Sequence, residues 1–199
     1  MRVIAGIYRS RRLISPRDTN LRPTSDRLRE TLFNVLGAAV EGARFVDLYA
    51  GTGAVGIEAL SRGAAEVVFV ESNVRAANLI QRNLDALGIT SGAAVFRVEA
   101  LRGLELLEAR HRKDSSEVAD IVFLDPPWSG EDEYASALTE LGAAHFLAPA
   151  ARVVVEHRRK AELSRAFGNL ALARRLEEGD AALSLYQGAE LGRRASSAR

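Results

Sequence analysis

The chain has 199 residues, enough for one domain with a substantial core but few for two. Apolar residues make up 47% and charged residues 27%, as in an ordinary globular protein, and the lack of cysteine excludes disulfides, thiol nucleophiles and cysteine-ligated metals. The three histidines show no metal-ligand spacing, and we find neither a signal peptide nor an apolar run of about 20 residues, so a cytoplasmic protein without membrane or metal is expected.

The net charge of +1 hides an uneven distribution along the chain. Residues 1–29 contain eight arginines and two aspartates, a balance of +6, whereas residues 30–150 have a balance of −9 and residues 151–199 one of +4. A basic N-terminal segment joined to an acidic body is typical of a protein that presents one face to a polyanion. Arginine outnumbers lysine 25 to 2, so the bias of a GC-rich genome is an alternative explanation.

The first 36 residues predict a small basic extension made of a β-hairpin and a helix. Residues 3–5 and 12–14 are short extended candidates around an arginine-rich turn. Thr24 or Ser25 can cap the helix that follows. Helical spacing predicts one buried and one polar face for this helix, formed by Leu28, Leu32, Val35 and Leu36 and by Arg27, Arg29, Glu30 and Asn34, respectively.

From residue 45 onward, strand-like and helical patterns alternate. Strands are expected at 45–49, 67–70, 94–98, 121–124 and 153–155, and helices at 54–62, 73–87, 101–112 and 133–144. Such alternation requires crossover connections and predicts a Rossmann-like, doubly wound α/β fold with a mostly parallel sheet. A short helix through Phe167 and a C-terminal antiparallel hairpin, from 170–177 and 181–187, should complete a domain over 37–190, and 191–199 should form a flexible tail.

A glycine-rich motif, DLYAGTGAVG at residues 47–56, follows the first expected strand. Glycines there allow a sharp turn and a close approach of the backbone to a ligand, and Glu71, after the second strand, can accept the hydroxyls of a ribose. The same pattern satisfies the dinucleotide fingerprint. However, Asp47 would repel a pyrophosphate and attract a cofactor with an ammonium and a sulfonium group, although a carboxylate that merely caps the turn is an alternative.

A second motif, Asp125-Pro126-Pro127-Trp128, ends the fourth expected strand and should face the glycine loop across one crevice. Prolines lack amide donors, so the loop offers mainly hydrogen-bond acceptors. Asp125 and a nearby carbonyl are predicted to hold an aromatic amino group, a poor nucleophile, toward a methyl donor, and Trp128 to stack on the base. A purely structural Pro-Pro turn is the alternative. Together the motifs predict a methyltransferase acting on the exocyclic amino group of a base, and the basic N-terminal segment favours a nucleic acid as the substrate.

Residues 22–33, 47–56 and 125–128 together resemble the RsmD family, bacterial methyltransferases that modify the N2 amino group of a guanine in 16S ribosomal RNA. The resemblance runs from residue 3 to 187. It implies a seven-stranded class I methyltransferase fold, S-adenosylmethionine as donor, and 16S rRNA in a partly assembled small subunit as substrate; we expect a monomer. Ser10 stands where the family usually has glycine, and Glu99 replaces its more usual aspartate or asparagine.

The expected site residues fall into three groups. Asp125, Pro126, Pro127 and Trp128 would hold the target base. The cofactor would be bound by Asp47, Tyr49, Gly51, Gly53, Glu71, Glu99 and Ala100, although Glu99 also suits a helix N-terminus without any ligand. RNA would be contacted by Arg9, Arg11, Arg12, Arg22, Thr24 and Arg29.

Three other functions remain open from the sequence. The first is a DNA adenine or cytosine amino-methyltransferase, because the amino groups of these bases are also poor nucleophiles that the same loop could position. Such enzymes, however, usually carry a separate recognition domain. An NAD-dependent oxidoreductase leaves Asp47 and the Asp125 loop unexplained. A non-enzymatic RNA-binding protein with a vestigial cofactor site is the third.

Overall fold

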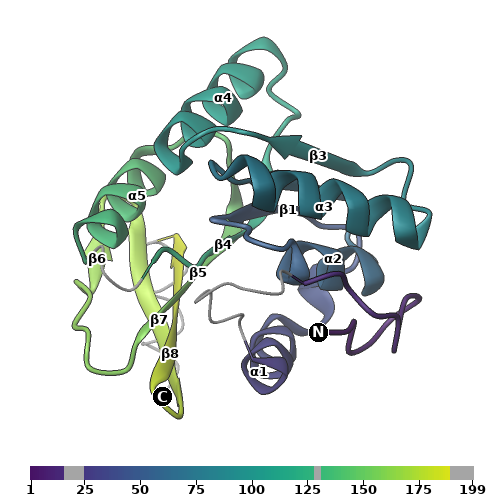
Figure 1. Cartoon of the computed structure of the whole chain (residues 1–199). Coiled ribbons are helices and arrows are strands. Elements are labelled where there is room, and N and C mark those ends of the chain that lie inside the picture. Colours follow the sequence, from purple (N-terminus) through teal and green to yellow (C-terminus); the bar gives the residue numbers. More distant parts are fainter. Residues whose placement is uncertain (16–24, 128–130, 189–199) are drawn as a thin grey trace. The chain divides into compact units, whose positions relative to one another are not determined.

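The computed structural model describes residues 1–15, 25–127 and 131–188, and the chain divides into two compact units, Met1–Glu99 and Ala100–Arg199. The first unit contains three parallel strands in the order β3-β2-β1. Every residue of β1 and β2 after the first is buried, as expected for strands covered on both faces. Figure 1 shows the elements of this unit, which are α1 (Asp26–Leu36), η1 (Gly37–Val40), β1 (Arg44–Leu48), α2 (Ala54–Ser61), β2 (Glu66–Val70), α3 (Val74–Leu87) and β3 (Ala93–Phe96).

The second unit combines one parallel strand pair with an antiparallel extension. Its strand order is β4-β5-β8-β7-β6, in which β4 and β5 are parallel and the other neighbours antiparallel. Gly142, in the last turn of α5, touches the backbone of Phe167, where a Cβ would overlap the Phe167 carbonyl oxygen. The elements are α4 (Ala100–Lys113), β4 (Ala119–Leu124), α5 (Glu131–Ala143), β5 (Leu147–Arg158), β6 (Ala166–Phe167), β7 (Leu170–Glu178) and β8 (Ala181–Gly188).

The predicted α/β class, the parallel strands and the C-terminal hairpin of β7 and β8 are confirmed. The predicted helix through Phe167 is wrong, because this segment forms the two-residue strand β6 on β7, which brings the described strands to eight. The Tyr186 hydroxyl donates to the Ser164 carbonyl at 2.8 Å, and Phe167 packs edge-on against the Tyr186 ring. These contacts with β8 hold the segment extended.

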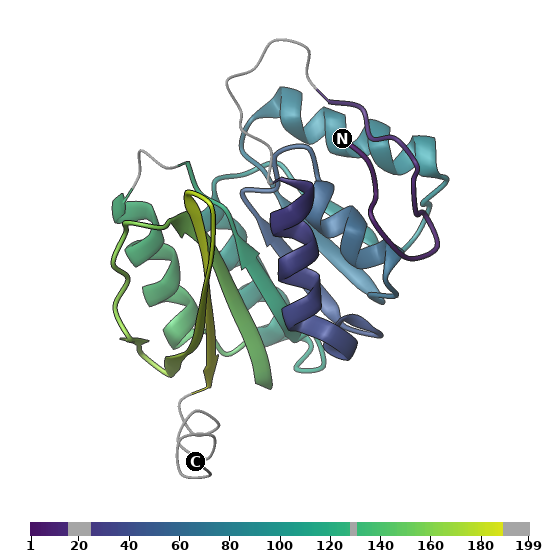
Figure 2. The same ribbon diagram turned by 90° about the horizontal axis from the view of Figure 1, so that it is seen from below.

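The predicted N-terminal hairpin is also confirmed. The Val3 amide donates to the Arg11 carbonyl at 3.0 Å, the Ser10 amide to the Val3 carbonyl at 2.9 Å, and Arg2 forms an antiparallel bridge with Arg12. Seen from below, the hairpin runs beside α2 and α3 (Figure 2). The tail at 191–199 lies outside the described residues.

Helix α1 begins where the sequence suggested. Ser25 is its N-cap, with Oγ accepting from the Leu28 amide at 3.1 Å, whereas Thr24 lies outside the described residues. Val35 is only half-buried, and Phe33 takes its place on the inner face. Within the described ranges no helix is long and apolar enough to span a lipid bilayer, and no group of acidic residues and histidines is arranged to hold a metal ion.

Candidate functional site

The turn between β1 and α2 has a left-handed backbone at three positions. Tyr49, Gly51 and Gly53 have φ of 61°, 55° and 77°. Glycine adopts this conformation freely, but for Tyr49 it costs about 1 kcal/mol. The Gly53 amide closes the turn by donating to the Ala50 carbonyl at 2.7 Å. Strain of this kind persists where the surrounding structure enforces it and is concentrated at functional sites.

Asp47, near the end of β1, bonds to the first turn of the helix that follows the glycine turn. Its side chain is buried, and its Oδ2 accepts from the Gly56 amide in the first turn of α2 at 2.8 Å. A Cβ on Gly56 would overlap the Phe69 ring, so glycine is required for α2 to pack this closely on β2. The capping role considered for Asp47 is therefore present, with a buried carboxylate at the first turn of α2.

Glu71 connects the ends of the neighbouring strands. Its Oε2 accepts from the Gly51 amide and its Oε1 from the Asn73 amide, both at 2.7 Å. Because each carboxylate oxygen can accept a second hydrogen bond, two further donors can be bound. The Glu71 amide donates to the Phe96 carbonyl at 3.0 Å, so the carboxyl ends of β2 and β3 lie together. The structure thus brings Tyr49, Gly51 and Glu71 to one edge of the first unit.

Glu99 and Ala100 lie at the division between the two units. Glu99 is exposed after β3, and Ala100 is the buried first residue of α4. A carboxylate here fits a cofactor contact and also fits stabilisation of a helix N-terminus, so the geometry supports both interpretations.

The Asp125 motif follows β4 in the second unit. The last four residues of this strand are buried, Asp125 is half-buried, Pro126 is buried and Pro127 is exposed. The two prolines contribute no amide donor, as expected from the sequence. Trp128 lies outside the described residues.

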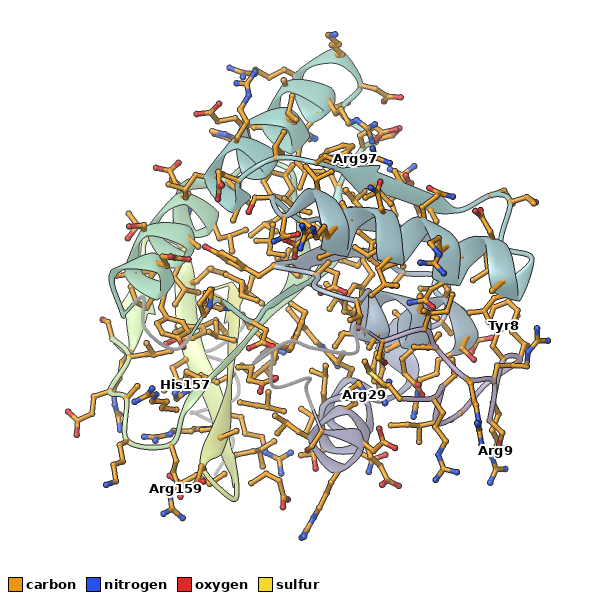
Figure 3. All side chains as sticks on the ribbon, viewed as in Figure 1. Tyr8, Arg9, Arg29, Arg97, His157 and Arg159 are labelled. Atoms are coloured by element: carbon orange, nitrogen blue, oxygen red, sulfur yellow. The ribbon has the colours of Figure 1, made fainter. Side chains whose placement is uncertain are left out.

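The predicted RNA-contacting arginines divide into exposed and buried residues. Arg9, Arg11 and Arg12 are exposed, and Figure 3 shows Arg9 pointing away from the N-terminal segment. One guanidinium nitrogen of Arg11 donates to the Ala86 carbonyl near the end of α3 at 3.1 Å. Arg22 and Thr24 lie outside the described residues.

The predicted exposed position of Arg29 is wrong. Its side chain is fully buried, and its guanidinium donates to the Arg2 carbonyl at 2.9 Å and to Asp26 Oδ1 at 2.6 Å. A second guanidinium nitrogen lies 3.8 Å from the buried carboxylate of Glu58 on α2. Periodicity places polar residues outside, whereas here a counter-charge distant in sequence draws the arginine inside. This side chain therefore does not contribute to an RNA-binding surface.

Sequence reasoning missed three polar side chains that anchor the hairpin. Glu58 accepts from the amides of Ile4 and Ala5 at 2.7 and 2.9 Å. Ser61 accepts from the Tyr8 amide at 3.0 Å, and Asn83 accepts from the Ile14 amide at 2.7 Å. No local pattern marks these three residues, because polar side chains are normally exposed and the burial of these on α2 and α3 appears only in the structure.

The comparisons with known proteins cover nearly the whole chain. The family model described as "Conserved hypothetical protein 95" matches residues 1–187. The chain is 35% identical to the putative rRNA methyltransferase YlbH of Bacillus subtilis over 94% of its length and 98% of that protein. It is also 35% identical to ribosomal RNA small subunit methyltransferase D of Escherichia coli K12, over 94% of this chain and 89% of that one.

Solved structures agree with the sequence relatives. The putative methyltransferase yhhF from Escherichia coli superposes with a TM-score of 0.77 at 31% identity, over 94% of this chain and 97% of that one. A hypothetical protein of Thermus thermophilus gives a TM-score of 0.77 at 30% identity, over 93% of this chain and 98% of that one. The protein therefore belongs to the family described as conserved hypothetical protein 95, the RsmD family that its three motifs resemble.

Proposed function

We propose that the protein transfers a methyl group from S-adenosylmethionine to the exocyclic N2 amino group of a guanine in 16S ribosomal RNA. The observation that carries this proposal is the bond from the Gly51 amide to Glu71, which joins the glycine turn to the expected ribose-binding carboxylate. It occurs in a chain 35% identical to a ribosomal RNA small subunit methyltransferase over 94% of its length.

The chemistry of the glycine turn suits this cofactor. Gly51 and Gly53 carry no side chains, so a ligand can approach the backbone closely. Glu71 has two acceptor positions left for the hydroxyls of a ribose. The buried carboxylate of Asp47 favours a ligand with positive charge over a pyrophosphate, which supports the methyl donor over a dinucleotide.

Asp125 would act on the nucleophile. When bound, S-adenosylmethionine supplies the electrophilic methyl group. The Asp125 carboxylate and a carbonyl of the proline pair would accept hydrogen bonds from the two N–H groups of the guanine amino group and aim its lone pair at the methyl carbon. The nitrogen would gain the methyl group as the sulfur–methyl bond breaks, and it would release one of its protons. Trp128 would stack on the base once it leaves its helix or loop, a contact of about 1–3 kcal/mol. Positioning would thus supply most of the rate enhancement.

Asp125→Ala tests this assignment. We expect the variant to lose methyl transfer while its affinity for S-adenosylhomocysteine, measured by calorimetry, stays near that of the wild type. Asp125→Asn, which keeps one acceptor oxygen, should retain more activity than Asp125→Ala. Wild-type turnover in the alanine variant would show that the assigned role is wrong.

The substrate is identified by incubating the enzyme with labelled cofactor and mapping the modified nucleoside. Naked 16S rRNA and small subunits from a methylation-deficient strain serve as the two substrates, and we expect the label on one guanine, with the partly assembled subunit favoured. Label on DNA would support a DNA amino-methyltransferase, and calorimetric binding of NAD instead of S-adenosylmethionine would support an oxidoreductase.

RNA binding is assigned to the hairpin on the evidence of charge and exposure. Arg9, Arg11 and Arg12 are exposed, and no acidic residue occurs in the first 15 positions. Replacing all three by glutamine should weaken RNA binding and reduce the slope of log affinity against log salt by about 0.7–0.9 per lost phosphate contact. The exposed residues Arg112 and Lys113 at the end of α4 provide a control, since their replacement should leave the slope unchanged.

The proposal also includes a monomeric enzyme, located in the cytoplasm, whose residues 1–36 form an RNA-binding extension of a methyltransferase domain at 37–190. Light scattering tests the oligomeric state. The extension is tested by RNA affinity, which should fall in the triple arginine variant while affinity for the cofactor remains.

A further inference from the structure

Asn83 joins two segments of the first unit that are distant in sequence. It lies on α3 with 1% of its surface exposed. Its Oδ1 accepts from the Ile14 amide at 2.7 Å, and its Nδ2 donates to the carbonyls of Ile14 at 3.2 Å and of Thr52 at 3.1 Å. The side-chain amide thus pairs with both backbone groups of Ile14 and with the glycine turn.

An asparagine at this position is unusual for its surroundings. The buried face of α3 is otherwise apolar, with Ile80 and Leu84 as near neighbours of Asn83 along the helix. A buried amide without partners costs several kcal/mol, so the residue is favourable here only because its acceptor and both donors are paired. A leucine of similar size would fill the space but would hold neither segment.

The two segments have distinct roles in the proposed function, on which this inference rests. Ile14 follows directly on the hairpin that presents the exposed Arg9 and Arg12. Thr52 lies between the two left-handed glycines, Gly51 and Gly53, which have no side chain to fix the backbone. Glu71 holds this turn by accepting from the Gly51 amide, and Asn83 holds it by donating to the Thr52 carbonyl.

We infer that Asn83 is a positioning residue, through which α3 keeps the cofactor turn in its binding conformation and fixes the end of the RNA-contacting hairpin to it. The residue does not act on the reacting atoms. Its contribution is the orientation of the Thr52 carbonyl, and therefore of the amides on either side of it.

Asn83→Asp and Asn83→Leu test the inference through the Kd of S-adenosylhomocysteine measured by calorimetry. The aspartate keeps the acceptor for the Ile14 amide but places an oxygen, which cannot donate, next to the carbonyls of Ile14 and Thr52. We therefore expect about tenfold weaker binding of S-adenosylhomocysteine at pH 8. Burial and the two carbonyls favour its protonated form, whose hydroxyl donates again. Affinity should therefore recover toward the wild-type value at pH 6. Asn83→Leu, which has no donor at any pH, should stay weak at both.

Gln81→Glu is the matched control. It makes the same change from amide to acid on the same helix, but Gln81 is exposed and donates only to the exposed Asp85, at 3.0 Å. Its Kd should equal that of the wild type at both pH values. If the leucine variant fails to fold, the Kd values of Asn83→Asp at the two pH values still test the inference.

Wild-type affinity in Asn83→Asp at pH 8, or in Asn83→Leu at either pH, would overturn the inference, because the turn would then keep its binding conformation without the Asn83 donor. Hydrogen exchange gives a second readout, since the Ile14 and Gly53 amides should exchange faster in Asn83→Leu. Failure of the wild-type protein to bind S-adenosylhomocysteine would instead refute the proposed function, and the exchange measurement would still test the structural role of Asn83.

Discussion

The N-terminal hairpin can lie against α2 only because residue 6 is a glycine. Its φ is 81°, and a Cβ would overlap the carbonyl oxygen of Ser61. In Gly6→Ala the hairpin must move away from three hydrogen bonds: Ile7 amide to Ser61 carbonyl at 2.8 Å, Tyr8 amide to Ser61 Oγ at 3.0 Å, and Ser61 Oγ to the Ala5 carbonyl at 2.5 Å. At about 1 kcal/mol each, with about 1 kcal/mol for the left-handed backbone, the docked state loses about 4 kcal/mol.

Native-state hydrogen exchange followed by NMR measures this loss directly. The Ile7 and Tyr8 amides should exchange about 100- to 1,000-fold faster in Gly6→Ala. The exchange rate of the fully undocked hairpin sets the upper limit of this increase. Affinity for S-adenosylhomocysteine should change less than twofold, because the Asn83 bond to the glycine turn lies elsewhere in the unit. RNA affinity should fall.

Gly179→Ala separates the steric clash from backbone strain. Gly179 has φ of 61° in the turn between β7 and β8, but nothing lies within 4 Å of a Cβ built there. This control should lose about 1 kcal/mol of unfolding free energy and leave exchange at Ile7 unchanged. Unchanged exchange at Ile7 and Tyr8 in Gly6→Ala would refute the reasoning, since the hairpin would then not be held by Ser61.

Three further predictions concern the buried and strained residues. Arg29→Leu should lower the free energy of unfolding in urea by about 3 kcal/mol, because the two charge-assisted hydrogen bonds to the Arg2 carbonyl and Asp26 are lost, although Glu58 keeps Arg62 as a counter-charge; a loss below about 1 kcal/mol would contradict this. Ser10→Gly removes the strain of a φ of 67°, but glycine also raises the entropy of the unfolded chain, so the net stabilisation of the hairpin should be about 0.5 kcal/mol. The Val3 amide should therefore exchange about twofold more slowly, and faster exchange would contradict the prediction. Burial lowers the pKa of His157, so the unfolded chain binds the proton more readily and the free energy of unfolding should fall as the pH drops below about 6.5. In urea titrations between pH 7.5 and 5, His157→Gln should lack this part of the decline. The same dependence of unfolding free energy on pH in both proteins would refute the prediction.

Local patterns predicted the elements of the fold well. The strand expected at 45–49 is observed at Arg44–Leu48, and the helix expected at 73–87 at Val74–Leu87, because alternation and capping residues act within a few positions. The segment around Phe167 was misread for the opposite reason. Its conformation is set by Tyr186 and Gly142, which no local pattern reveals.

In the candidate site, too, features set by neighbouring residues were predictable and features set by distant partners were not. The contact between Gly51 and Glu71 was predictable, because a glycine turn and the carboxylate after the next strand form one pattern within about 20 residues of sequence, whereas their role in binding a cofactor stays a prediction. The positions of Arg29 and Asn83 were not predictable, since each owes its place to partners tens of residues away. Periodicity places a polar residue on the surface, and it cannot tell when a distant charge or carbonyl will satisfy that residue in the interior.

The anchoring of the hairpin has a consequence for the order in which the protein assembles during translation. The hairpin is synthesised before its partners Glu58 and Asn83, which follow 54 and 69 residues after Ile4 and Ile14. The ribosome must therefore complete α3 before the first segment can dock, and at about 5–20 residues per second this delay is several seconds. During that interval the basic residues of the hairpin segment belong to a nascent chain that cannot yet dock on α2 and α3.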